Sequence, residues 1–136
     1  MVSISIVYEG ELHCRLIHEP SGTVIATDAP KDNHGKGESF SPTDLVAAAL
    51  GSCMLTLMGI FADRRGLKLS GTQVEVAKEM AQEPFRKIGK LSVTFQFPAG
   101  IPKNDRQALE RAGLTCPVHK SLHPDISIPA VFLHPD

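Results

Sequence analysis

Cys53 lies in the middle of the most hydrophobic stretch of the chain, the run LVAAALGSCMLTLMGIF from Leu45 to Phe61. Two interpretations of this thiol are open. Free cysteine packs well in cores, where it behaves as a small hydrophobe. A thiol in a dry pocket is also suited to chemistry, and a second cysteine near the C-terminus gives that interpretation more weight.

Cys116, in the segment TCPVHKSL, is expected at the start of a helix, because Pro117 suits the first helical position. As N-cap, its sulfur would face the N–H groups of Val118 and His119 at the positive end of the helix dipole, which favours thiolate over thiol. Lys120 or a protonated His119 would add positive charge. The local sequence therefore predicts that Cys116 is the activated thiol. The alternative is a cysteine that only caps the helix.

The third cysteine, Cys14, is expected to be inert. It alternates with Leu12 and Leu16 along a predicted strand, so it lies on the apolar face, where free cysteine usually packs. The six histidines are scattered, and only CPVH places one near a cysteine at a spacing typical of metal ligands. One such pair does not make a four-ligand zinc site, although Cys53 and Cys14 could complete it. We therefore expect no metal.

Length and composition indicate one intracellular domain. A chain of 136 residues buries one core comfortably but not two, so we expect a single domain over residues 1–136. The formal net charge of -1 argues against a nucleic-acid partner, because such proteins usually carry a basic excess. Three separated cysteines do not fit a secreted disulfide framework, and the N-terminus lacks a signal-peptide pattern. The apolar run is short for a membrane span, so we expect a core helix, no membrane partner and a cytoplasmic protein.

Hydrophobic alternation and capping residues predict the first elements. Residues 2–27 alternate with a period of two between the breaks YEGE and PSGT, which indicates three short antiparallel strands. The segment DAPKDNHGKGESFSP is expected to be a long exposed loop. The motif SPTD then begins a helix, with Ser41 as N-cap, Pro42 in the first position and Asp44 as the capping-box acid. A cationic last turn followed by Gly66 ends this helix.

The remaining elements complete an α+β arrangement. GTQVEVAKEM and KIGKLSVTFQFP are expected to be strands joined by a wide turn. Asn104 is expected to cap a short amphipathic helix that ends at Gly113, and a second short helix is expected from Pro117. ISIPAVFL is expected to be the final strand, with Pro129 indicating an edge or a bulge.

The central helix is apolar on nearly every side, which is typical of a helix in the middle of a core. One side of a three-stranded sheet cannot cover such a helix. A second subunit is therefore expected to supply part of the cover, and we predict an intertwined homodimer.

The two cysteine motifs together resemble the OsmC and organic hydroperoxide resistance proteins. The resemblance rests on SPTDLVAAALGSCMLTL followed later by CPVHKSL, and the loop IATDAPKDNHGKGESFSP is similar to the one that precedes the central helix in the OsmC-like branch. The order and spacing of these motifs resemble the family's over nearly the whole chain. The resemblance implies an OsmC-like fold, with antiparallel sheets around a long buried central helix that carries Cys53, in an intertwined homodimer with two sites at the subunit interface.

The resemblance also implies a thiol-dependent peroxidase that needs no cofactor. By position, Cys53 matches the peroxidatic cysteine and Cys116 the resolving one. Cys53 would reduce an organic hydroperoxide and become a sulfenic acid, with which Cys116 would condense to a disulfide. An external dithiol, lipoyl-type in better-known relatives, would restore both thiols. The resemblance thus makes Cys53 the reactive thiol, whereas the local sequence favours Cys116. The two agree only if a charged group reaches Cys53, because a thiol in apolar surroundings is otherwise inert.

In the hydroperoxide-resistance branch an arginine from the first sheet and a glutamate on the helix form the activating pair. The arginine maps onto Arg15, for which the alternative is a solvated strand residue. The glutamate position holds Thr43, which cannot orient an arginine by a charge-assisted bond. Either Asp44 or Glu38 substitutes for the glutamate, or the site is weaker or differently tuned.

Apolar side chains near the predicted site would bury the organic tail of a hydroperoxide and select it over hydrogen peroxide. A second hypothesis is a dimeric protein that binds an apolar ligand, with the cysteines as relics or redox sensors. Thiol–disulfide exchange on proteins is disfavoured, because the chain lacks a Cys-x-x-Cys pair. The residues expected to bind the organic tail are Phe40, Leu50, Leu57 and Phe61.

Overall fold

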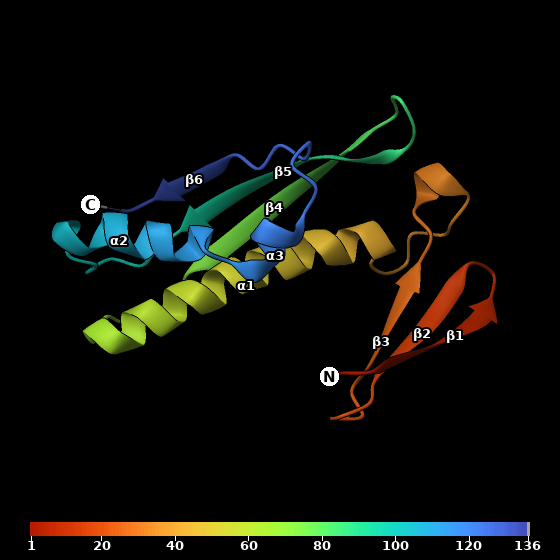
Figure 1. The fold of residues 1–136 in the computed structure, drawn as a ribbon, viewed down its shortest axis with the longest axis horizontal. Helices are drawn as coiled ribbons and strands as arrows, with labels where there is room; N and C mark the ends of the chain where they lie inside the picture. Colours follow the sequence, from red (N-terminus) through yellow and green to blue (C-terminus); the bar gives the residue numbers. More distant parts are fainter. Residues whose placement is uncertain (136) are drawn as a thin grey trace. The chain divides into compact units, whose positions relative to one another are not determined.

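A computed structural model describes residues 1–135 and has the predicted α+β composition (Figure 1). The chain divides into two compact units, Met1–Val46 and Ala47–Asp136, each of which is described by itself. The expectation of a single folding domain stays a prediction. The first unit contains β1 (Ile4–Gly10), β2 (His13–His18), β3 (Val24–Asp28), the 3-10 turn η1 (Lys31–Asn33) and the start of α1 (Pro42–Arg65). The second contains the rest of α1, β4 (Gln73–Ala81), β5 (Lys87–Gln96), α2 (Lys103–Leu114), α3 (Pro117–Ser121) and β6 (Ala130–Leu133).

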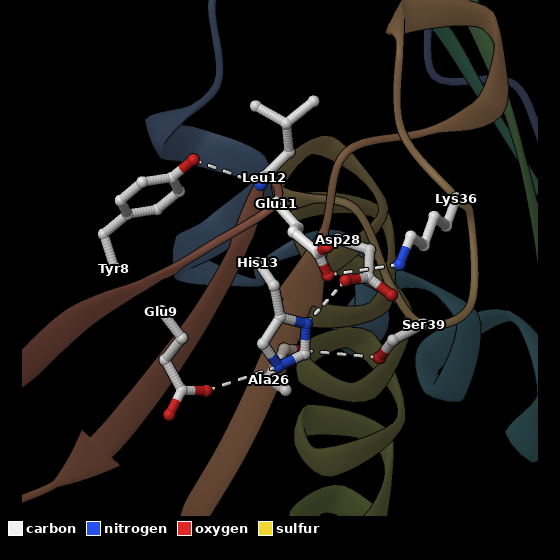
Figure 2. Close-up of polar contacts among 9 residues, drawn as sticks. All are labelled: Tyr8, Glu9, Glu11, Leu12, His13, Ala26, Asp28, Lys36 and Ser39. Carbon is white, nitrogen blue, oxygen red and sulfur yellow. Dashed lines mark hydrogen bonds and ion pairs between the residues drawn. The ribbon is translucent and has the colours of Figure 1, made fainter.

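The first unit is built on an antiparallel sheet in the order β1-β2-β3, as the alternation predicts. A tight turn joins β1 to β2, and three consecutive residues in it have positive φ: Gly10 at 89°, Glu11 at 54° and Leu12 at 62°. The Leu12 N–H donates to the hydroxyl of Tyr8 over 3.2 Å (Figure 2). Leu12 was expected on the strand beside Cys14; it lies in the turn, because the tight reversal needs left-handed residues at that point.

The register of this sheet separates two faces. Cys14 pairs with Tyr8 on one side and Thr27 on the other, so these three side chains share a face. Arg15 points to the opposite face, as predicted. The Cys14 face is not a closed core within this chain: Cys14 is half-buried, and several apolar side chains of the same face are exposed. They are Ile4, Ile6, Tyr8 and Ile25.

Helix α1 begins with the predicted capping box. The main-chain N–H of Ser41 donates to the carboxylate of Asp44 over 2.9 Å, and the N–H of Asp44 donates back to the Ser41 hydroxyl over 3.1 Å. Pro42 is the first helical residue. Reciprocal bonds of this kind satisfy two main-chain donors that a helix N-terminus otherwise leaves without partners.

The same helix ends where the sequence predicts. Gly66 has a left-handed φ of 68°, and its N–H donates to the carbonyl of Asp63. The N–H of Leu67 donates to the carbonyl of Ala62. These two bonds form a Schellman motif, which closes the C-terminus of a helix of 24 residues.

The second unit is a three-stranded sheet with all its helices on one face. The order is β4-β5-β6, with β4 antiparallel and β6 parallel to β5, so this sheet is mixed. Helices α1 and α2 lie along one face of this sheet (Figure 1). On that face β5 carries a row of buried side chains that belong to the same core as residues of both helices. Phe95 in this row stacks on Phe132 of β6 with ring centroids 5.1 Å apart. The row consists of Leu91, Val93, Phe95 and Phe97.

Within this chain helix α1 is buried on one face, as expected for a helix that a single three-stranded sheet covers. A single sheet covers a single face of a helix, and within this chain the opposite face stays open. By length and composition α1 is the helix within residues 1–135 that is apolar enough to cross a membrane, a property that core helices of soluble proteins share. The buried face consists of Ala47, Leu50, Gly51, Met54, Met58 and Ala62, and the exposed one of Ala48, Ala49, Ser52, Thr56 and Ile60.

The C-terminal elements agree with the sequence except at two boundaries. Helix α2 starts at Lys103 with Pro102 as N-cap, so Asn104 lies inside the first turn and is not the cap. The carbonyl of Pro102 accepts directly from the N–H of Asp105 over 3.0 Å, and a side-chain cap is not needed. Strand β6 lies at the sheet edge, as Pro129 indicates, but it begins at Ala130, so residues 126–129 of the expected strand precede it.

Helix α1 approaches the sheet closely at Gly51. A Cβ added there would lie 2.9 Å from Cγ2 of Val76, whereas at Gly59 it would meet nothing within 4 Å. We expect Gly51→Val to lower the free energy of unfolding by about 1–3 kcal/mol through overpacking. Gly59→Val is the matched control and should change it by less than about 0.5 kcal/mol. Urea unfolding measures both, and equal values for the two variants would contradict this packing.

Candidate active site

Cys116 is the N-cap of α3, as predicted. Its sulfur accepts a hydrogen bond from the main-chain N–H of His119 over 3.3 Å, and Pro117 is the first helical residue. The side chain is fully buried in the core of the second unit. The N-cap geometry of Cys116 therefore matches the prediction from the sequence, whereas the burial of its side chain was not predicted.

The chemical consequence of this burial is opposite to the expectation. Desolvation raises the pKa of the Cys116 thiol above its usual value, and a side-chain hydrogen bond with Cys53 raises it further. Hydrogen bonds from the N–H groups of His119 and Val118 lower the pKa but do not offset these effects. The prediction that Cys116 is the activated thiol is thus wrong, because burial disfavours the charged form.

Cys53 lies on α1 beside the buried face and packs, half-buried, against the same core as Cys116. Cys53 and Cys116 pack against one core, and the proximity of Cys53 raises the pKa of the Cys116 thiol. Both cysteines are free. Two segments far apart in the sequence thus place a cysteine each at the same core, inside one compact unit.

The apolar residues that were expected to bind an organic tail have different environments. Leu50 is fully buried in the core, which gives it a packing role. Leu57 is half-buried, and so is Phe61, whose ring lies 4.9 Å from the guanidinium carbon of Arg65. Phe40 belongs to the first unit and is exposed.

The residues expected to activate a thiol lie in the first unit. The Asp44 carboxylate accepts the Ser41 N–H in the capping box, and the Thr43 hydroxyl lies 3.2 Å from that of Ser41. Arg15 forms an ion pair with Glu9, with 3.6 Å between Nε and Oε2. Sequence reasoning missed Glu9, because it lies where the pairing of β1 with β2 shifts register and alternation no longer predicts which face a residue is on.

A histidine between two carboxylates extends this ion pair (Figure 2). Nδ1 of His13 lies 2.6 Å from Oδ1 of Asp28, and Nε2 lies 3.5 Å from Oε1 of Glu9. The hydrogen bond with Asp28 raises the pKa of His13, and the charges of Asp28, Glu9 and Glu38 add to this against an opposing effect of desolvation. Charges on β1, β2 and β3 therefore form one connected group.

Metal ligands do not gather in the described structure. Within residues 1–135, no three His, Cys, Asp or Glu side chains are arranged to hold a metal ion.

Comparison with known proteins relates the chain to one family. The model of the family described as OsmC-like protein matches residues 35–129. Among proteins with curated functions, none matches this sequence.

Solved structures resemble the chain over nearly its whole length. A candidate osmotic stress induced and detoxification response protein from Psychrobacter arcticus is 41% identical, with a TM-score of 0.92 and coverage of 98% of this chain and 96% of that one. An organic hydroperoxide resistance protein OsmC from Legionella pneumophila is 16% identical, with a TM-score of 0.74 and coverage of 97% and 96%. The organic hydroperoxide resistance protein OhrB of Bacillus subtilis is 14% identical, with a TM-score of 0.73 and coverage of 98% of both chains. The last two show a shared fold.

The influence of Cys53 on the Cys116 thiol is testable by alkylation. In a Cys14→Ser background, Cys53→Ala should lower the pH at which iodoacetamide modifies half of Cys116 in a fixed time, because the hydrogen bond and charge of Cys53 raise its pKa. Peptide mass spectrometry after labelling across pH 6–10 measures this midpoint. The Cys14→Ser parent is the control. A midpoint that stays unchanged or rises would show that the two thiols do not interact.

The His13 group predicts a pH-dependent stability. A histidine whose pKa is raised on folding stabilises fully below its unfolded value of about 6.5, and this contribution is lost as pH rises through the folded value. His13→Asn should therefore lower Tm more at pH 5.5 than at pH 8.5. Differential scanning fluorimetry measures the difference. In an Asp28→Asn background its pH dependence should shrink, and a constant Tm difference across this range would contradict the assignment.

Proposed function

The chain belongs to the OsmC-like family, and from this premise we propose that it is a thiol-dependent peroxidase that reduces organic hydroperoxides through Cys53 and Cys116. Structures with the same fold include organic hydroperoxide resistance proteins, which supports a peroxide-related stress function at the level of the family. The OsmC-like fold is a soluble domain, so the apolar α1 is a core helix. The observation that carries the proposal is the packing of two free cysteines, Cys53 and Cys116, against one core.

In the first step the Cys53 thiolate attacks the distal oxygen of the hydroperoxide. The O–O bond breaks, the alkoxide takes up a proton and leaves as an alcohol, and the Cys53 sulfur becomes a sulfenic acid. Arg15 is proposed to supply the positive charge that favours the thiolate. The raised pKa of Cys116 supports this division of labour, because it keeps Cys116 protonated and out of competition for peroxide.

In the second step the Cys116 sulfur attacks the sulfenic acid. A disulfide forms between the two cysteines and water leaves. An external dithiol, lipoyl-type by family resemblance, then reduces this disulfide to two thiols and is itself oxidised to a disulfide. No metal or organic cofactor takes part in the proposed cycle.

A homodimer is part of the proposal. The Cys14 face of the first sheet exposes an apolar surface, with Ile6 62% and Tyr8 63% exposed in the single chain. Helix α1 likewise leaves one apolar face open. Contiguous exposed apolar surface is typical of protein–protein contacts, and a second copy of the chain is the proposed cover.

Steady-state reduction of cumene hydroperoxide with dihydrolipoamide tests the function. Cys53→Ser should abolish turnover, because no other group forms the sulfenic acid. Cys116→Ser should lose turnover with the dithiol yet still consume about one equivalent of peroxide in a single burst. Cys14→Ser is the matched control and should retain the wild-type rate.

Equal rates for the wild type and Cys53→Ser would refute the peroxidase. After peroxide treatment of the wild type, mass spectrometry of non-reduced digests should detect a disulfide-linked pair of peptides that contain Cys53 and Cys116. The absence of this pair would refute the resolving role of Cys116.

One observation favours a second candidate, a redox sensor on the same scaffold. Thr43 stands where the hydroperoxide-resistance branch has a glutamate, so thiol activation has lost its expected acid. A sensor would form the Cys53–Cys116 disulfide with stoichiometric peroxide but would show no turnover with a dithiol. The same two assays therefore distinguish the candidates.

A further inference from the structure

The segment of residues 29–40, which we call the strap, connects β3 to α1 and is tied back to the first sheet. At its start the N–H of Ala29 donates to the carbonyl of Leu12 over 3.1 Å. At its end the carbonyl of Phe40 accepts from the N–H of Asp28 over 3.0 Å. Both ends of the strap therefore meet at the last residue of β3.

Three carboxylates from three elements act on one imidazole at this point. His13 of β2 is the direct cross-strand partner of Asp28, and its Nδ1 lies 2.6 Å from Oδ1 of that carboxylate. On the other side of the ring, Nε2 lies 3.5 Å from Oε1 of Glu9 on β1 (Figure 2). The third carboxylate is Glu38 of the strap, whose charge also acts on the ring. A proton on His13 therefore attracts β1, β3 and the strap at once.

The other cations of this group keep their charge across neutral pH. Lys36 of the strap lies with its Nζ 3.2 Å from Oε2 of Glu11, and this hydrogen bond raises the pKa of Lys36 (Figure 2). Arg15 pairs with Glu9 and stays protonated in proteins. Histidine is the side chain that ordinarily changes charge between about pH 5 and 8. His13 is thus the member of the group that responds to pH near neutrality.

We propose that the strap is a pH-sensitive device, held closed against the first sheet by the proton on His13. A neutral imidazole donates from one nitrogen only, so it can serve Asp28 or Glu9 but not both. Loss of the proton also leaves the three carboxylates to repel one another, and one of them, Glu38, is on the strap. The base of the strap then loosens, while the main-chain ladder of the sheet stays formed.

The direction of the response follows from the groups around His13. The hydrogen bond with Asp28 raises the pKa of His13, and the charges of Asp28, Glu9 and Glu38 raise it further against an opposing effect of desolvation. The attraction is therefore fully present below the ordinary value of about 6.5 and is lost as pH rises through the raised value. The strap is closed at mildly acidic pH and opens more often at alkaline pH. Such an opening is local and needs no global unfolding.

The device lies wholly in the first unit and involves neither Cys53 nor Cys116. It goes beyond the proposed peroxidase, and its test needs no turnover.

Hydrogen exchange of the full chain, followed by mass spectrometry, tests the inference. Protection factors correct for the effect of pH on the exchange chemistry itself. For peptides that cover the strap, we expect them to fall about two- to fivefold between pH 6 and pH 8.5, the size expected for a partly exposed ion pair. Peptides from β5 are the internal control and should keep their protection, because they report the stability of the second unit.

His13→Asn should remove the pH dependence of the strap and leave its protection near the alkaline value. His18→Asn is the matched control, because His18 is on the same strand but its Nδ1 lies 2.6 Å from the hydroxyl of Ser21 and not from a carboxylate. It should keep the full pH dependence. Glu38→Gln should reduce this dependence, because it removes the carboxylate that belongs to the strap.

The wild type alone decides the first question, so the test does not depend on whether a variant folds. Strap protection that is constant or rises from pH 6 to pH 8.5 would overturn the inference. An equal fall in the strap and in β5 would also overturn it, because the change would then be global. A pH dependence that persists in His13→Asn would assign the response to another group. Each of these results leaves the peroxidase untouched, and an inactive wild type leaves the strap untouched.

Discussion

The packing of α1 against one face of the second sheet is the constraint on which the proposed chemistry depends. Close approach at Gly51 and the buried row on β5 fix how α1 lies on the sheet, and hence where Cys53 projects. The same core surrounds Cys116 at the start of α3. Because interiors are close-packed, neither sulfur is free to move far from the other. A pair of thiols that are remote in sequence becomes a local pair through this core.

Two opposing effects act on Cys116, and their sizes decide the result. A helix N-terminus favours a negative charge by about 0.3–1 kcal/mol. Burial in apolar surroundings shifts a pKa by up to about 3–5 units in fully buried groups, which is several times larger. The thiol at the end of α3 is therefore held in its protonated form although its sulfur accepts a main-chain hydrogen bond. A capping cysteine is an activated cysteine only where solvent or a cation is near.

The first sheet separates two kinds of surface. On one side, contacts between side chains of the three strands join Asp28, His13, Glu9 and Arg15 into one group. The other face exposes apolar side chains and the half-buried Cys14. Strand alternation produces both faces from one short stretch, because neighbouring residues point in opposite directions. For this reason the 18 residues of β1, β2 and β3 provide both a charged cluster and an apolar surface suited to association.

The sequence by itself determined the features that depend on near neighbours. The capping box of Ser41 and Asp44, the stop at Gly66, the N-cap at Cys116 and the strand alternation were all predictable, because each involves residues a few positions apart. Tertiary structure decided the rest: which face of α1 is buried, the raised pKa of Cys116, the core that it shares with Cys53, and the pairing of Arg15 with Glu9. Burial and cross-strand contact depend on what packs against a residue from elsewhere in the chain, and that information is absent from any local pattern.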